Sequence, residues 1–372
     1  MQRFTGAVAL LGLIVTAPSA GSDLQRRAGA ADETHPGIVT TYGSLDVAGR
    51  VELRTILTRP EGVQKPPVIQ FVQWLSCDTV EIGPDAADGW SQMLRGMVRN
   101  SGFAIMRTDK RGVGDSGGGP CSALDYVTEL SDQRAALAAL SARDDVDTSR
   151  IVVFGASMGS RMAGQVAAGA PGVVGVLGWG GGSKTWFERM LAFDRNAMER
   201  GGTAAGEIAT RMREHSAFHA RYLLEGRDPP DIIAADPAMA AVWAGVVGTS
   251  ATDHYGRPFA FHQQAQQADF TAAWGEIGVP VLMVMGEYDW FENRAGHETV
   301  VHIVNRNGAG LARFEEIPRM DHHFTLFDSA EAAFRGAGGR ADAGPFLRVA
   351  LAWLKALRVP PEPAAAPPAG TP

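Results

Sequence analysis

The sequence of 372 residues contains only two cysteines, no run of lysines or arginines, and no internal repeat. Its formal net charge of −7 is mild for a chain of this length. Without a basic patch the chain has little to attract nucleic acid or an anionic membrane surface, so we expect neither as a partner. Hydrophobic residues make up 45% of the sequence, which is enough to bury a large core in one domain with an insertion or in two smaller domains.

The two ends of the chain differ in composition from the rest. Near the amino terminus, Arg3 precedes an apolar run over residues 8–15 and a group of small residues over 17–22. This pattern predicts a secretory signal peptide over residues 1–22 and a secreted or periplasmic protein, with no membrane span after cleavage; the cleavage point stays open, and an uncleaved anchor is the alternative. Proline and alanine dominate residues 359–372, which we expect to form a disordered tail.

Cys77 and Cys121 are the only two cysteines. In an exported protein an isolated pair is expected to form a disulfide, and metal binding would need further ligands at suitable spacing. On the chain-entropy model such a bridge would stabilise the fold by roughly 4 kcal/mol. Two buried free thiols are the alternative.

Strand-like apolar runs alternate with helical patterns along most of the chain, which predicts a parallel sheet covered by helices on both faces. We expect strands over residues 51–57, 68–72, 103–106, 151–154, 173–177, 281–285 and 313–317. We expect helices over residues 90–98, 126–142, 160–168, 298–304 and 346–357. The alternation stops over residues 183–270, which have helical patches and many aromatics but no buried-strand run, so we expect a helical cap there between core segments 35–182 and 271–358.

The pentapeptide Gly155-Ala156-Ser157-Met158-Gly159 lies between an expected strand and an expected helix. A tight turn at such a junction exposes a serine hydroxyl at the positive end of the helix, and the turn requires small residues two positions before and after the serine. The pattern therefore predicts that Ser157 is a nucleophile.

A serine nucleophile needs a base, and the base needs a carboxylate that fixes its tautomer. Asp289 follows the strand expected over 281–285, and open α/β sheets gather their catalytic groups at that end of their strands. We predict Asp289 as the carboxylate, with Glu287 as its alternative. The alternative to a catalytic role is that the Asp289 carboxylate only caps a following helix.

Histidines that follow the strand expected over 313–317 could supply the base. We predict His322 in this role, with His323 as the alternative. His297 fits the face of a solvated helix. His215 and His219 have the i, i+4 spacing of a metal-binding pair, but without a third ligand nearby we expect them at the surface and predict no metal site.

The chain order of serine, aspartate and histidine, with the GxSxG pentapeptide, is similar to that of the α/β-hydrolase superfamily. The segment from Asp109 to Ser116 looks like the DxRGxGxS loop that follows the fourth strand in many capped members. The resemblance covers residues 51–357 apart from the cap. It implies an α/β-hydrolase fold with a mostly parallel eight-stranded sheet, and a structural rather than catalytic role for Asp109 and Ser116.

The resemblance also implies an oxyanion hole made by two backbone amides, that of Met158 and one from the loop after the third strand. That loop usually reads His-Gly, whereas this chain has Gln73-Trp74-Leu75-Ser76-Cys77. By position we expect Leu75 to be the second donor, with Trp74 as its alternative. In the strand order typical of the fold, a Cys77–Cys121 disulfide would pin this loop.

These features together imply a serine hydrolase that works through an acyl-enzyme, without a metal or organic cofactor, on a small-molecule or short peptide substrate. Carboxylic esters are the first expectation. An exported exopeptidase is the alternative, which would need an acidic group in the cap to hold the substrate ammonium; Glu188, Glu199, Glu207 and Glu214 are available. A noncatalytic binding protein of the same fold is the third possibility, and the oligomeric state is not evident from the sequence.

Overall fold

A computed structural model of the protein describes residues 32–47 and 49–358. The expected signal peptide (1–22) and proline-rich tail (359–372) lie outside the described residues.

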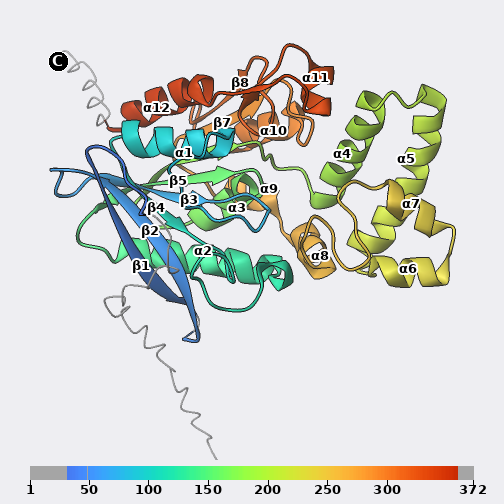
Figure 1. Cartoon of the computed structure of the whole chain (residues 1–372), viewed down its shortest axis with the longest axis horizontal. Coiled ribbons are helices and arrows are strands. Elements are labelled where there is room, and N and C mark those ends of the chain that lie inside the picture. The colour runs from blue at the N-terminus through green and yellow to red at the C-terminus, as the bar shows by residue number, and fades with distance from the viewer. Residues whose placement is uncertain (1–31, 48, 359–372) are drawn as a thin grey trace, which may run out of the picture.

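The core is one eight-stranded sheet with the strand order β1-β2-β4-β3-β5-β6-β7-β8 (Figure 1). Its strands are β1 (Ile38–Val47), β2 (Val51–Pro60), β3 (Pro67–Val72), β4 (Ala104–Thr108), β5 (Asp147–Ala156), β6 (Val173–Trp179), β7 (Val281–Gly286) and β8 (Ala312–Ile317). Strand β2 runs antiparallel to both of its neighbours, β1 and β4. From β4 onward in the strand order, including β3, each strand pairs in parallel with the next. The prediction of a mostly parallel eight-stranded sheet is therefore confirmed.

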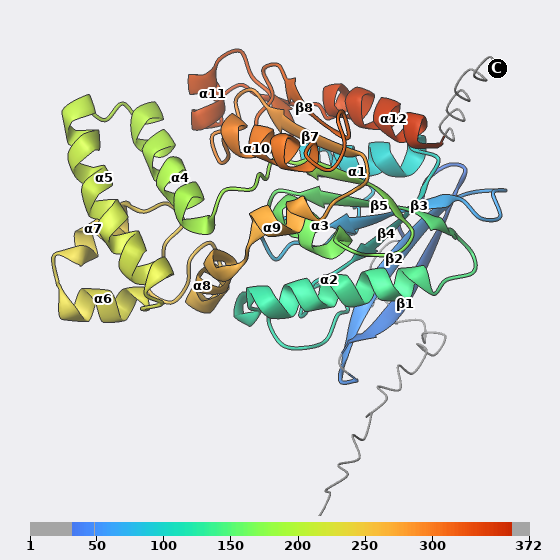
Figure 2. The same ribbon diagram turned by 180° about the vertical axis from the view of Figure 1, so that it is seen from behind.

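Two layers of helices cover the sheet because side chains alternate along each buried strand. In β3, Val68 and Val72 face one layer, whereas Ile69 and Phe71 face the other. The first layer contains α2 (Tyr126–Ser141), α3 (Met158–Ala167), α9 (Phe270–Gly275) and α10 (Arg294–Val304). The second contains α1 (Gly89–Asn100) and α12 (Gly344–Arg358), which lie side by side in both views (Figure 1, Figure 2).

The strands and helices differ from the sequence prediction mainly at their ends. Strand β1 was not predicted, because only two of its residues are buried and its sequence has no simple alternation. Helix α3 begins at Met158, two residues earlier than predicted, so that it starts directly after Ser157. After β8 the chain adds the short pair β9 (Thr325–Leu326) and β10 (Arg340–Ala341), with α11 (Ala330–Arg335) between them.

Residues 180–280, the helical insertion, connect β6 to β7. They form α4 (Trp186–Arg200), α5 (Ala205–His219), a π-helical turn (Ala220–Leu224), α6 (Pro229–Ala235), α7 (Met239–Gly245), α8 (Phe259–Gln267) and α9. Helices α4 to α7 make a lobe beside the sheet, and α8 and α9 lead back to the core (Figure 1, Figure 2). Several aromatics of the helical insertion pack on one another: Phe218 stacks on Trp243, and Tyr222 contacts Phe259 on α8 edge-on. Among the described helices, none combines the length and the apolar character that crossing a bilayer requires.

Candidate active site

Ser157 occupies the sharp turn between β5 and α3. Its backbone has φ 57° and ψ −118°, a conformation that side chains other than glycine rarely adopt. The two flanking glycines make the turn possible. A Cβ on Gly155 would lie 2.1 Å from the carbonyl oxygen of Gly159, and a Cβ on Gly159 would lie 2.0 Å from that of Val72. The spacing of the pentapeptide thus reflects backbone-to-backbone contact on both sides of the serine.

The structure brings Ser157 together with one histidine and one aspartate from the ends of later strands. Asp289 follows β7, and His322 lies in the loop after β8. His322 Nε2 is 2.9 Å from Ser157 Oγ, and His322 Nδ1 is 2.7 Å from Asp289 Oδ2. With Nδ1 protonated toward the carboxylate, Nε2 is left as an acceptor for the serine hydroxyl proton.

The surroundings favour a charged carboxylate beside this imidazole. Burial alone would raise the pKa of Asp289, but the charge and hydrogen bond of His322 lower it below its ordinary value. The other oxygen, Oδ1, accepts from the backbone N–H groups of Phe291 and Glu292 at 2.9 and 3.1 Å. For His322, burial alone would lower the pKa, but the Asp289 carboxylate raises it above 6.5.

The two alternative residues lie elsewhere. His323 is half-exposed, and its Nδ1 lies 3.4 Å from the Asp321 carboxylate. Glu287 is exposed, and its Oε2 accepts the backbone N–H of Arg319 at 2.7 Å. Neither residue takes part in the hydrogen-bonded series that joins Ser157 to His322 and His322 to Asp289.

Aromatic side chains hold the imidazole of His322 in place. The ring of Phe291 stacks on it with centroids 4.9 Å apart, and Trp90 meets it edge-on at 5.9 Å. Trp90 also contacts Trp74, at 4.6 Å. Gly180, with φ +60°, lies against the same imidazole, because a Cβ there would be 2.8 Å from His322 Cε1. No motif in the sequence marks Trp90 or Phe291 as part of the site.

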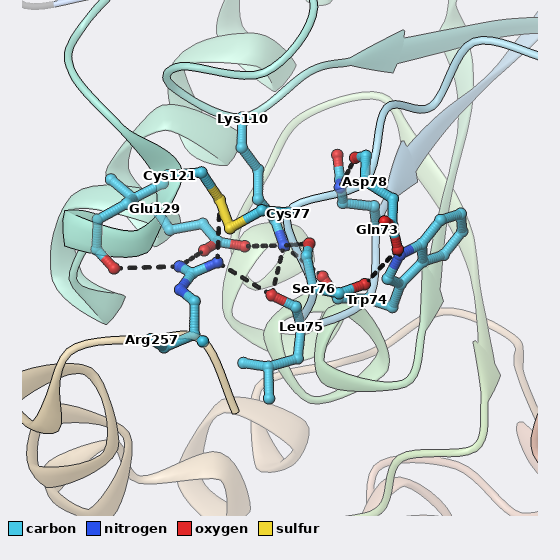
Figure 3. The surroundings of a disulfide bond; sticks show 12 residues. Gln73, Trp74, Leu75, Ser76, Cys77, Asp78, Lys110, Cys121, Glu129 and Arg257 are labelled. Atoms are coloured by element: carbon cyan, nitrogen blue, oxygen red, sulfur yellow. Dashed lines mark hydrogen bonds and ion pairs between the residues drawn. A yellow bond between two sulfur atoms is a disulfide. The ribbon is translucent and has the colours of Figure 1, made fainter. Parts of the chain in front are cut away.

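The loop after β3 is held from several sides (Figure 3). Cys77 forms the predicted disulfide with Cys121, which follows the neighbouring strand β4. The ammonium of Lys110, fully buried, donates to three successive carbonyls of the loop: that of Trp74, that of Leu75 at 3.0 Å and that of Ser76 at 2.8 Å. Burial lowers the pKa of Lys110 to about 8.

Arg257, from the helical insertion, completes this arrangement. Its guanidinium donates to the Leu75 carbonyl at 3.0 Å and to the Leu124 carbonyl at 3.1 Å, and it pairs with Glu129 on α2. Glu129 also lies 3.3 Å from the Lys110 ammonium, so one buried carboxylate serves two cations (Figure 3). Lys110 lies within the DxRGxGxS-like segment, which the sequence itself marks. Nothing near Arg257 in the sequence indicates its long-range contacts with Leu75 and Glu129.

A second buried ion cluster connects the insertion to the loop of Asp289. Glu292 accepts from Arg161 on α3 at 2.7 Å and from Arg189 on α4 at 3.2 Å. Because the backbone N–H of Glu292 donates to Asp289, this cluster fixes the carboxylate relative to the helix that begins after Ser157.

The DxRGxGxS-like segment after β4 uses its polar side chains within the fold. Asp109 is buried, and its carboxylate accepts from Arg54 Nε at 2.7 Å and from the Val80 N–H at 2.9 Å. Ser116 Oγ accepts from the Arg54 N–H at 2.8 Å. These contacts agree with the structural role that the resemblance implies.

The expectations for three other histidines were wrong. His215 and His219 are buried rather than at the surface, because α4 covers the face of α5 on which they lie and places Asp194 between them. His297 is also buried, and its Nδ1 lies 2.9 Å from the Asn293 carbonyl. Helical spacing shows that two residues share a face, but it does not show what covers that face.

A family model described as the Alpha/beta hydrolase family matches residues 83–337. Among solved structures, similar folds include carboxyl esterase 2 of Tuber melanosporum (TM-score 0.52, 14% identity, 89% of this chain and 90% of that chain) and an esterase of Pyrococcus furiosus (0.52, 10%, 92% and 99%). An acylaminoacyl peptidase of Pyrococcus horikoshii is similar over 86% of this chain and 41% of its own (TM-score 0.51, 11% identity). At these identities the likeness shows the fold alone. A search of curated protein sequences gave no match.

Proposed function

Because this chain belongs to the α/β-hydrolase family, we propose that it is a serine hydrolase that cleaves carboxylic esters through an acyl-enzyme. The observation that carries the proposal is the hydrogen-bonded series Ser157–His322–Asp289, with contacts of 2.9 and 2.7 Å. Nucleophilic catalysis needs a serine, an imidazole and a carboxylate together, and here the serine lies in a strained turn and the carboxylate is buried. No purely structural role requires this combination.

In this mechanism Ser157 Oγ attacks the ester carbonyl carbon while its proton passes to His322 Nε2. Asp289 orients the imidazole and stabilises the positive charge that it gains. His322 then returns the proton to the leaving alcohol, and the acyl-enzyme forms. Water, deprotonated by the same nitrogen, releases the acid and restores the serine.

Backbone N–H groups of Met158 and Leu75 are the proposed oxyanion donors. In the described part of the chain neither group donates to a protein acceptor. The Trp74 carbonyl and the Leu75 N–H belong to one trans peptide unit and point in opposite directions. Since the Lys110 ammonium draws that carbonyl to one side, the Leu75 N–H is held toward the other. The contact of Gly159 with the backbone at Val72 places the beginning of this loop against the turn of Ser157.

Esters are favoured over peptide substrates by the charges of the insertion. An exopeptidase would need a carboxylate for the substrate ammonium, but Glu188, Glu199, Glu207 and Glu214 are exposed on the lobe. Three of these glutamates already bond locally: Glu188 to Thr185, Glu199 to Arg195 and Glu207 to Arg211. The aromatic rings around His322 instead favour an apolar acyl or alcohol group.

We further propose that the mature protein is secreted or periplasmic and that residues 183–270 act as a cap over the site. The disulfide supports export, because such bonds persist in oxidising compartments. The predicted signal peptide over 1–22 supports it independently.

The first experiment is labelling of the protein with a fluorophosphonate probe, which reacts with activated serines. Wild type should be labelled, and Ser157→Ala should not be. Absence of labelling in wild type, or equal labelling of the variant, would contradict the proposed nucleophile and favour a noncatalytic binding protein. Rates on p-nitrophenyl acyl esters should exceed those on aminoacyl anilides; the reverse order would overturn the preference for esters.

A further inference from the structure

A buried cluster of one carboxylate and two imidazoles lies inside the helical insertion. Asp194 on α4 is 1% exposed, and His215 and His219 on α5 are 3% and 0% exposed. His215 Nδ1 and His219 Nε2 each lie 2.8 Å from Asp194 Oδ2. We propose that these three residues bind a divalent transition-metal ion of the zinc class, at a site separate from Ser157.

The residue types and their placement suit such an ion. Imidazole nitrogen and carboxylate oxygen are ordinary zinc ligands, and sites with two histidines and one carboxylate are well suited to the metal. The i, i+4 spacing puts both imidazoles on one face of α5, and α4 supplies the oxygen from the facing helix. The three ligand atoms all lie within 4.8 Å of one another.

The charge of the cluster gives a second argument. Asp194 is buried, and its Oδ2 lies between the two imidazoles. Among the described residues its ion pairs are with His215 and His219 alone, and neither lysine nor arginine neutralises it. When both imidazoles are neutral, no full positive charge in these pairs balances the buried carboxylate, and a divalent cation would supply that charge.

The hydrogen bonds of the cluster leave a further oxygen unused. Asp194 Oδ1 is buried and has no hydrogen-bond partner. It can serve as a fourth donor atom if the carboxylate binds the ion through both oxygens. Around a tetrahedral zinc ion, ligand atoms from different residues are about 3.4 Å apart, so the two contacts of 2.8 Å would lengthen by about half an ångström. Small movements of side chains are enough for this change.

The position of the cluster suggests what the ion would do. It would join α4 to α5, the two helices that form one side of the lobe. Helix α4 also carries Arg189, which bonds to Glu292 beside the Asp289 loop. The ion would therefore stabilise the lobe and anchor the helix that contacts the catalytic loop, without touching the reacting atoms.

The test is metal binding by the tag-free protein with its disulfide intact. The protein is stripped with a chelator and dialysed, Zn²⁺ is titrated in competition with a chromophoric chelator, and retained metal is measured after desalting. We expect one equivalent of zinc per chain and a rise in Tm with zinc. Replacement by Co²⁺ should give the intense visible bands of a four-coordinate ion. Retention below a tenth of an equivalent in wild type would overturn the proposal and leave a hydrogen-bonded cluster only.

Variants locate the site. His219→Gln should lose both the retained zinc and the zinc-dependent rise in Tm. His302→Gln, which changes an exposed histidine on α10, is the matched control and should keep both. Fluorophosphonate labelling of Ser157 reports folding of the core in each variant. Equal zinc retention by His219→Gln and wild type would place the metal elsewhere and refute the assignment. If His219→Gln does not fold, His215→Gln provides the same test, and the wild-type titration decides by itself whether the chain binds zinc.

Discussion

Removal of the disulfide should separate the stability of this protein from its activity. The perturbation is the double variant Cys77→Ala and Cys121→Ala. The two cysteines are 44 residues apart in sequence. Closing a loop of this length restricts the unfolded chain by an entropy worth about 4 kcal/mol, so we expect the free energy of unfolding to fall by about that amount.

Activity should change far less, because the disulfide is not the only restraint on the loop after β3. Lys110 donates hydrogen bonds to the carbonyls of Trp74, Leu75 and Ser76. The Leu75 carbonyl accepts a second hydrogen bond, from Arg257. These contacts remain in the double variant. We therefore expect kcat to stay within about threefold of wild type, which is less than 1 kcal/mol of barrier.

The assay combines urea denaturation with ester hydrolysis, both at neutral pH and well below the unfolding temperature of the variant. Wild type treated with reductant provides the comparison without mutation. A fall in kcat beyond about a hundredfold in a protein that is still folded would show that the disulfide itself positions the oxyanion donor. A stability loss below about 1 kcal/mol would refute the loop-entropy reasoning.

The remaining predictions concern the charged groups of the site. Asp289→Asn should lower kcat by about 10⁴-fold, because the imidazole of His322 is no longer held in the required tautomer. Glu287→Gln should leave the rate of p-nitrophenyl ester hydrolysis unchanged. A large effect of Glu287→Gln would make Glu287 the carboxylate of the site in place of Asp289. Since the proposed base, His322, can accept a proton only when neutral and its pKa is raised, kcat/KM should fall with decreasing pH through an ionisation above 6.5. A midpoint below 6.5 would contradict this. Arg257→Gln removes a donor to the Leu75 carbonyl and should lower kcat by about tenfold to a hundredfold with little change in KM, less than the loss of a whole oxyanion donor. Unchanged kcat would show that Lys110 and the disulfide hold the loop without Arg257.

Much of the fold could be predicted because its signals are local. The buried runs of β3, β5 and β7 have strand length and lie between helical patterns, so a parallel sheet with two helical layers follows from the sequence. The candidate site also has local signals, since Ser157 directly follows β5, and Asp289 and His322 lie in the loops after β7 and β8. Parallel strands end at one edge of the sheet, and this geometry brings the three residues together.

What could not be predicted depends on which helices face each other. Asp194 and His215 are 21 residues apart and belong to different helices, so the sequence pattern of one helix does not indicate its contact with the other. Arg257 reaches Glu129 across 128 residues from a segment without a motif. Burial of His297 and His219 likewise depends on neighbours that a helical pattern does not identify. Long-range contacts of polar side chains carry no period in the sequence, whereas strands and helices do.

The unusual loop after β3 shows how such contacts can replace a motif. A His-Gly sequence would let the backbone adopt the oxyanion geometry through the freedom of glycine. Here Trp74, Leu75 and Ser76 lack that freedom, and three carbonyls that converge on one ammonium supply the orientation instead. Each carbonyl fixed on the side of Lys110 turns the N–H of the following residue to the opposite side, because the peptide unit is planar and trans. A buried lysine, costly in itself, is thereby given a function that explains why the fold retains it: it sets the direction of the Leu75 amide, which we propose to bind the oxyanion.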